Sequence, residues 1–249
     1  MGIFPSSVNP GRVSEDVEVE ALRTAVRAAQ DEILMAVAFY ETWRPTIENA
    51  DLANQLGTSF ATNAFNVIQF SLQRELLLAL VRIWDTNKKS LRMTAIREKL
   101  KRADIVERIV QDRKRAMGMR ADVSGPLRAA IGPKCAHAVT LISKYIDGGA
   151  RFRKLQKLVD IRHLRLAHRQ LASPENGMPE VVRAEIDEIY LETIEIVQTL
   201  LSAVNAVSFP MGEAAEASRH YAEMFWQGVR GERTQGHPAF KSPCRNGLD

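Results

Sequence analysis

The stretch VIQFSLQRELLLALVRIW, residues 67–84, decides the fold class of this chain. Apolar residues recur along it every three or four positions, which is the spacing of one face of an α-helix. Arg74, Glu75 and Arg82 interrupt the apolar run, so it is typical of a buried helix and not of a membrane span. We therefore predict a helix over about 60–84 with an inner stripe of Val67, Ile68, Leu72, Leu76, Leu80 and Trp84.

The same helical spacing extends to both sides of this stretch. Before it, a helix is predicted to open at Ser14 and to be kinked or ended by Pro45. The inner face of that helix would hold Leu22, Val26, Ala29, Ile33, Val37 and Tyr40. After it, further helices are predicted over about 94–110, 133–172, 180–207 and 213–229, with a break or tight turn at Gly148-Gly149 and an end at SPENGMP, residues 173–179.

The segment 111–134 is basic and contains Gly118, Gly125 and Pro126, so a loop or a set of short turns is predicted there. Its charges fit a solvated surface or a contact with RNA. Structural roles are the simplest interpretation of several other side chains: a place in the core for Trp43, Trp84 and Trp226, and a structural role for Cys135, His137 and His220.

The predicted elements indicate an all-α fold. Neither strand-like alternation nor an internal repeat is found, and four to five long amphipathic helices joined by loops form a helical bundle. A short C-terminal helix and a polar tail follow the bundle. We expect a flexible N-terminus over 1–13, a single helical domain over 14–230 and a polar tail over 231–249.

Composition narrows the class of protein. The chain has 249 residues, 45% hydrophobic and 26% charged, which is the balance of a soluble globular protein. A net charge of +4 permits a polyanionic partner without requiring one. Cys135 and Cys244 suit neither a disulfide framework nor a metal site, and no apolar leader opens the sequence. We therefore expect a cytoplasmic protein with no bound metal and no membrane partner.

A second stretch, DIRHLRLAHRQL over residues 160–171, contains the candidate catalytic residues. It places Arg162, His163, Arg165, His168 and Arg169 in an otherwise apolar helical frame. A guanidinium matches the oxygens of a phosphate, and a histidine accepts or donates a proton near neutral pH. Together they suffice to cut RNA without a metal: a base removes the 2′-OH proton, the 2′-oxygen attacks phosphorus, and the guanidinium stabilises the phosphoryl charge.

Helix geometry limits how this pair could act. Positions six apart on a regular helix differ by about 120° in direction and about 9 Å in rise, so Arg162 and His168 do not lie side by side. They could converge if the helix unwinds near His168, or across a dimer interface. The spacing itself is common, because Arg230 and His237 repeat it in the polar tail without a helical frame.

This arrangement resembles the HEPN superfamily, whose members share an Arg, a polar residue, and a His after four to six intervening positions. The frame is also similar, since the motif lies late in a long helix of a bundle and is followed by a loop and a final core helix. The stretch LALVRIWDTNKKSLRMTAI, residues 78–96, resembles the abortive-infection, AbiU-type branch, in which an apolar helix ends in Arg-x-x-Asp, here Arg82 to Asp85. The resemblance covers about residues 15–207.

The resemblance implies a role for each motif residue. Arg162 and His168 match the catalytic pair, and His163 matches the polar position, which is most often Asn in the family. His163 would orient the pair or supply a second titrating group. Arg165 and Arg169 are either a solvated face or contacts to RNA phosphates. Arg82 and Asp85 are either a helix-end ion pair or a support for RNA binding. A related sub-branch has a regulatory Tyr where this chain has Gln170, so that regulation is not expected.

The resulting prediction is a HEPN-like, metal-independent endoribonuclease that uses no cofactor. It would act as a toxin or in phage defence by abortive infection, as a homodimer that binds RNA and is restrained by an antitoxin protein. The alternative is a non-catalytic helical module that binds RNA, a nucleotide or a partner protein through the same cleft. A helical scaffold with no nucleic-acid role is a third possibility. Cleavage of RNA separates the first class from a non-catalytic module, and cleavage that survives EDTA separates it from metal-dependent nucleases.

Overall fold

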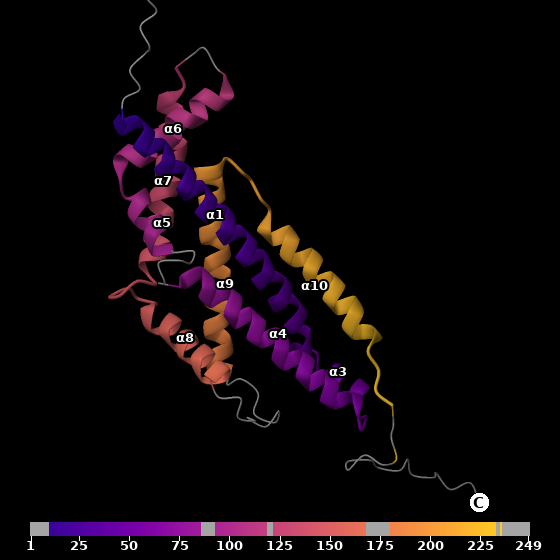
Figure 1. Cartoon of the computed structure of the whole chain (residues 1–249). Helices are drawn as coiled ribbons and strands as arrows, with labels where there is room; N and C mark the ends of the chain where they lie inside the picture. Colours follow the sequence, from indigo (N-terminus) through magenta and orange to yellow (C-terminus); the bar gives the residue numbers. More distant parts are fainter. Residues whose placement is uncertain (1–9, 86–92, 119–121, 168–179, 233–234, 236–249) are drawn as a thin grey trace, which may run out of the picture.

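The computed structural model describes residues 10–85, 93–118, 122–167, 180–232 and 235, and for residues 10–16, 162–167 and 180–182 it describes the backbone alone (Figure 1). These residues form helices and contain no strand, which confirms the all-α prediction. In chain order the helices are α1 Pro10–Trp43, α2 Pro45–Glu48, α3 Ala50–Leu56, α4 Ala61–Trp84, α5 Met93–Leu100, α6 Ala103–Met117, α7 Ser124–Ser143, α8 Phe152–Ala167, α9 Glu180–Leu200, a π-helical turn η1 Leu201–Asn205, and α10 Met211–Gly228.

The long helix α1 is the axis of the bundle. Its C-terminal half packs against α4 and α10, its N-terminal half meets α5, α6 and η1, and it also contacts α9, while α8 lies beside α4 and α9 (Figure 1). The faces that meet form one large apolar core. A smaller cluster joins α3 to α10, and its members are Leu52, Leu56, Ala222 and Trp226.

The first predicted helix is confirmed in its inner face and its end. The predicted apolar positions of α1 are all buried. Pro45 separates α1 from α2, where it occupies the first helical position and its missing N–H has no intrahelical partner to lose. The helix begins at Pro10, four residues before the predicted Ser14.

The predicted helix over 60–84 is confirmed as α4, but part of its predicted stripe is wrong. Val67 is 59% exposed and Ile68 is 43% exposed. The inner face of this half of α4 instead includes two glutamines, Gln69 and Gln73. Gln69 donates to the backbone oxygen and the hydroxyl of Thr46, both at 3.1 Å, and Gln73 is buried. The apolar pattern misled the prediction because polar side chains fill inward positions.

The predicted loop over 111–134 is largely wrong. α6 continues to Met117 and is capped by Gly118 in the left-handed region, and α7 begins at Ser124. Pro126 falls in the first turn of α7, where an N–H is not needed, so it starts the helix and does not break it. Pro133 lies inside α7. The helix predicted over 94–110 is divided into α5 and α6.

The break predicted at Gly148-Gly149 is confirmed, because α7 ends at Ser143 and α8 begins at Phe152. Gly148 has a φ of 81°, a conformation that favours glycine. The helix predicted over 180–207 ends in the π-helical turn η1, and α10 matches the short helix predicted before the tail. Trp43, Trp84 and Trp226 are buried as predicted.

Among the described helices, α4 is long and apolar enough to cross a membrane by length and composition. A core helix of a soluble protein meets the same criteria, and α4 has a buried face that includes Leu76, Leu77, Leu80 and Trp84. Of its most apolar stretch 33% is buried inside the bundle, so packing accounts for part of this composition.

Candidate functional site

Helix α8 carries the first part of the Arg–His motif. Arg162, His163 and Arg165 lie within α8, where the backbone is helical. Their side chains are not described, and His168 and Arg169 lie outside the described residues. The structure therefore describes a helical backbone through the first part of the predicted motif, as far as Ala167.

The face of α8 that meets the bundle is set by Leu155 and Leu158, which are both buried in the large core. Residues three and four apart share a helix face, so position 162 continues the line through Leu155 and Leu158. Position 163 is rotated by about 100° from position 162. The first motif position therefore lies on the side of α8 that faces the bundle.

A row of ion pairs attaches α8 to α9. Lys157 Nζ lies 2.8 Å from Glu185 Oε2, Lys154 pairs with Glu188, and Arg151 pairs with Glu188 and, at 3.1 Å, with Glu192. The paired residue numbers rise on α8 as they fall on α9, so the two helices are antiparallel. Extending this register places position 162 level with about residue 180, at the start of α9.

The far end of this row is a partly buried polar cluster around Glu192. Lys144 Nζ lies 2.8 Å from one carboxylate oxygen, and the hydroxyl of Tyr145 donates to the other. Burial raises the pKa of the Glu192 carboxyl, but the bonds from Lys144 and Tyr145 and the charge of Arg151 lower the pKa by more, so it lies below its usual range. Burial and the contact with Glu192 raise the pKa of Tyr145. The ionised carboxylate fixes the turn that leads into α8.

A second polar network joins α9 to α1 and α10. The Tyr40 hydroxyl donates to Asp187 Oδ1 at 2.9 Å, and its ring stacks on Tyr190 with centroids 4.0 Å apart. Tyr190 donates to Glu41 at 3.2 Å, and Arg219 donates to both oxygens of Glu41 at 2.8 and 3.2 Å. Burial and the nearby carboxylates raise the pKa of both tyrosines. The sequence analysis placed Tyr40 on an inner face but missed Glu41, Asp187, Tyr190 and Arg219, which join α9 to α1 and α10.

Arg82 and Asp85 lie at the end of α4, away from position 162. Arg82 Nε lies 2.9 Å from Glu32 Oε2 of α1. The expected pair with Asp85 is not formed between these two described residues, because the side chain of Arg82 extends toward α1. Trp84, beside them in the chain, donates from Nε1 to Thr193 of α9 at 3.2 Å. Thr193 lies about 20 Å along α9 from residue 180, which is level with position 162. Arg82 and Asp85 therefore lie at a different level of the bundle from position 162, and their support of RNA binding stays a prediction.

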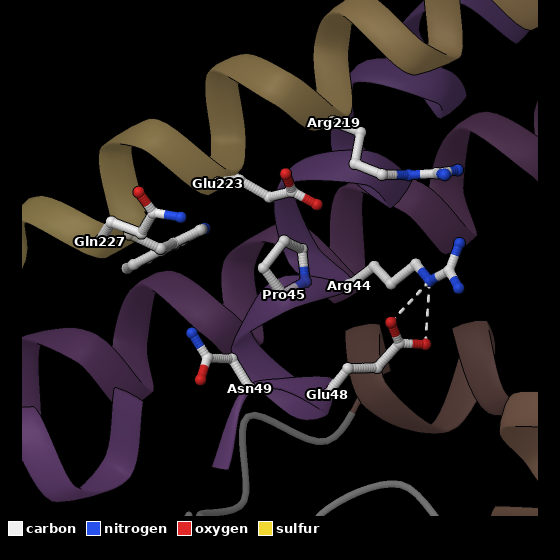
Figure 2. Close-up of a pocket in the computed structure, with 8 residues that line it drawn as sticks. Arg44, Pro45, Glu48, Asn49, Arg219, Glu223 and Gln227 are labelled. Atoms are coloured by element: carbon white, nitrogen blue, oxygen red, sulfur yellow. Dashed lines mark hydrogen bonds and ion pairs between the residues drawn. The ribbon is translucent and has the colours of Figure 1, made fainter. Parts of the chain in front are cut away.

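A cavity of about 410 Å³ opens between α2 and α10 (Figure 2). Figure 2 shows Arg44 and Glu48 on one side of it and Arg219 and Glu223 on the other. Arg44 Nε donates to both oxygens of Glu48 at 2.8 Å, which raises its pKa, and Arg219 is bound to Glu41. Because carboxylates already neutralise both guanidinium groups, this cavity does not suit a phosphate.

Metal ligands are not gathered anywhere in the described part of the chain: no group of three or more His, Cys, Asp or Glu side chains is arranged to hold an ion. His137, which was interpreted as structural, lies 2.9 Å from Glu195 on the exposed surface between α7 and α9. Cys135 is buried in α7, which fits its structural interpretation.

The family of this chain follows from comparison with known proteins. A family model, HEPN_AbiU2 (AbiU2), matches residues 19–225, which run from the first core positions of α1 to the last turn of α10. No curated protein and no solved structure matches the chain. The matched region includes the helical bundle and the Arg–His motif on which the resemblance to this branch rests. The chain therefore belongs to the AbiU2 family of HEPN proteins, an abortive-infection family with an all-α fold.

Proposed function

We propose that this protein is a metal-independent endoribonuclease that acts as a toxin or phage-defence effector. The observation that carries the proposal is the family match over residues 19–225, which contains Arg162 and His163 within helix α8 and His168 shortly after it. Arg and His are the residue types that this chemistry needs. The cytoplasm is the proposed site of action, and an antitoxin protein is the proposed restraint.

In the proposed reaction, His168 removes the proton from a ribose 2′-OH and the 2′-oxygen attacks the adjacent phosphorus. The bond to the 5′-oxygen breaks, and that oxygen takes up a proton as it leaves. The products are a 2′,3′-cyclic phosphate and a 5′-OH end. Arg162 stabilises the charge on the phosphoryl oxygens, and His163 orients the pair or shares the proton transfers.

The proposal includes a homodimer. Arg162 and His168 are about 120° apart on a regular helix, so a second copy of the motif would complete the group of residues around one phosphate. The attachment of α8 supports this arrangement, because Leu155, Leu158 and the ion pairs to α9 hold the motif helix at a fixed position on the bundle. Arg165 and Arg169 would add contacts to neighbouring RNA phosphates.

The test is to incubate purified protein with structured and unstructured RNAs in the presence of EDTA and to map the product ends. We expect cleavage that leaves 2′,3′-cyclic phosphate and is lost in Arg162→Ala and in His168→Ala. General acid–base catalysis alone accounts for roughly 10²–10⁴-fold, so residual activity of either variant should be small. Arg153→Ala, on the exposed face of α8, and His220→Ala, exposed on α10, are matched controls that should cleave normally.

Two results would contradict the proposal. One is cleavage that EDTA abolishes. The other is the absence of product although all variants are folded and bind RNA in a salt-dependent way, which would favour the non-catalytic binding module. In that case Arg162→Ala would weaken RNA binding and no buffer would yield product.

A further inference from the structure

A second cleft, of about 680 Å³, lies where α1, α6 and the π-helical turn η1 meet. Arg23 and Arg27 of α1 line it on one side, and Arg113 and Arg115 of α6 line it on another. Val204 and Val207 supply an apolar wall. Its volume is that of a small-molecule site, and its lining combines an apolar wall with a few charged groups, as such sites do.

Positive charge is in excess in this cleft. Among its lining residues, four guanidinium groups face the two carboxylates of Glu20 and Asp112. The Asp112 carboxylate is shared: Arg23 lies 3.1 Å from it, Arg108 lies 3.4 Å from it, and Arg115 also pairs with it. Glu20 is 3.5 Å from both Arg23 and Arg27, which is long for a charge-assisted hydrogen bond. The carboxylates therefore leave the cleft with a net positive charge.

Arg113 is the clearest sign of an anion site. Its Nη2 donates to two backbone carbonyl oxygens, of Ser202 at 3.2 Å and of Ala203 at 3.1 Å. No carboxylate of the described residues lies within ion-pair distance of it. Burial and the charge of Arg23 lower the pKa of Arg113, but an arginine side chain stays protonated. A half-buried cation held by neutral carbonyls is stabilised when an anion binds beside it.

The wall opposite α6 is irregular in the same place. η1 is π-helical, and Ala206 follows it with a φ of 60°, which is uncommon for a residue with a side chain. Asn205 Nδ2 donates to the Arg23 carbonyl at 3.3 Å, but its buried Oδ1 has no hydrogen-bond donor in the described structure. Such irregular turns and unsatisfied groups gather at functional sites.

We propose that this cleft binds the phosphate groups of a nucleotide or of an RNA strand. One guanidinium group can donate two parallel hydrogen bonds to a phosphate, so the four that line this cleft offer donors for more than one phosphate group. Val204 and Val207 would contact the ribose or the base. The cleft is at the opposite end of α9 from the level of position 162, about 30 Å away, so it is separate from the Arg–His motif and does not depend on the proposed cleavage.

The experiment measures binding of three probes to the full chain by isothermal titration calorimetry. The probes are pyrophosphate, ATP, and a twelve-residue 2′-O-methyl oligonucleotide, which lacks the attacking hydroxyl and so is not cleaved. The variants are Arg113→Gln and the double variant Arg27→Gln/Arg115→Gln. Arg128→Gln is the matched control, because Arg128 and Arg115 are both 55% exposed and each pairs with one carboxylate.

We expect at least one probe to bind, with affinity reduced about tenfold for each guanidinium–phosphate contact removed. Arg128→Gln should leave that affinity unchanged. Binding of ATP and pyrophosphate would identify a free nucleotide as the ligand, and binding of the oligonucleotide alone would identify the RNA backbone. The proposal is overturned if no probe binds the folded wild type, or if Arg128→Gln weakens binding as much as the cleft variants do. Circular dichroism of each variant excludes unfolding as the cause.

Discussion

Lys157 Nζ lies 2.8 Å from Glu185 Oε2, and this ion pair joins α8 to α9 five residues before Arg162. Lys157 is half-buried and the carboxylate of Glu185 is more buried, so solvent screens the pair less than it screens a pair on the open surface. Together with the pairs of Lys154 and Arg151, this pair fixes the position of α8 along α9, and so the position of the motif on the bundle. The position of the motif thus depends on charges outside the motif.

Reversing these two charges tests that dependence. We expect Lys157→Glu to lower the free energy of unfolding by about 1 kcal/mol, because it places two carboxylates opposite each other. The double variant Lys157→Glu/Glu185→Lys should regain most of this stability. Urea denaturation of the wild type, Lys157→Glu, Glu185→Lys and the double variant gives the coupling energy. If the proposed cleavage is correct, the single variant should also cleave more slowly and the double variant should recover.

The matched control is the exposed pair of Lys101 and Glu98 on a different part of the surface, 3.3 Å apart. Lys101→Glu should cost less than about 0.5 kcal/mol, since exposed pairs contribute little. A double variant no more stable than Lys157→Glu alone would show that the α8–α9 contact is not electrostatic.

Periodicity was enough to predict the all-α fold and most helix positions, because the core faces of α1 and α9 are formed by regularly spaced apolar residues. It failed at α4, where Gln69 and Gln73 are inside and Val67 is outside. It also failed at α7, because Gly125 and Pro126 were interpreted as a loop although the first turn of a helix accepts both. In each case contacts with other helices, and not the local sequence pattern, determined which side chains are buried or where the helix begins.

The candidate site was predicted only in part, for a physical reason. A motif in one helix specifies residue types and spacing, but not which partner helix lies opposite. The three basic residues at 151, 154 and 157 and the acidic residues at 185, 188 and 192 have helical spacing on both sides. That complementarity was the signal that α8 and α9 pair in antiparallel order.

The link before α8 requires a glycine at position 149, whereas Gly212 of α10 has room for a side chain. A Cβ at Gly149 would lie 2.4 Å from the backbone oxygens of Lys144 and Ser143, whereas a Cβ at Gly212, in the first turn of α10, would contact nothing within 4 Å apart from its chain neighbours. We expect Gly149→Ala to destabilise the protein by about 2 kcal/mol or more, since the backbone must shift. Gly212→Ala should stabilise it by about 0.5–1 kcal/mol. Thermal unfolding of both variants measures whether each one is less or more stable than the wild type. Equal changes in stability would contradict the close approach of the Lys144 and Ser143 oxygens to Gly149.

Glu41 and Arg219 illustrate a buried charge that depends on one partner. Glu41 is 1% exposed, while Arg219 is 39% exposed and bonds both of its oxygens. Replacing Arg219 by Met leaves the carboxylate buried with only the Tyr190 hydroxyl, so we expect a loss of roughly 2–4 kcal/mol. Arg128→Met, which breaks an exposed pair with Glu107, should cost less than about 1 kcal/mol. Similar losses in the two variants, measured by urea denaturation, would argue against the buried role of Glu41.

Burial in α7 makes Cys135 a source of pH-dependent stability. It raises the pKa of the Cys135 thiol to about 11, whereas the thiol of an unfolded chain has a pKa of about 8.5. Below about pH 8.5 the thiol is protonated in both states, so the contribution of the neutral thiol is fully present. Above it the unfolded state loses its proton first, and stability falls as the pH rises toward 11.

The measurement compares Cys244→Ser with Cys135→Ala/Cys244→Ser, so that Cys135 is the sole thiol difference. Between about pH 8 and pH 10 we expect the first protein to lose about 2 kcal/mol more of its unfolding free energy than the second. The buried tyrosines titrate in both proteins and cancel in this difference. Parallel curves of stability against pH would show that Cys135 has an ordinary pKa and is therefore not enclosed by the α7 interface.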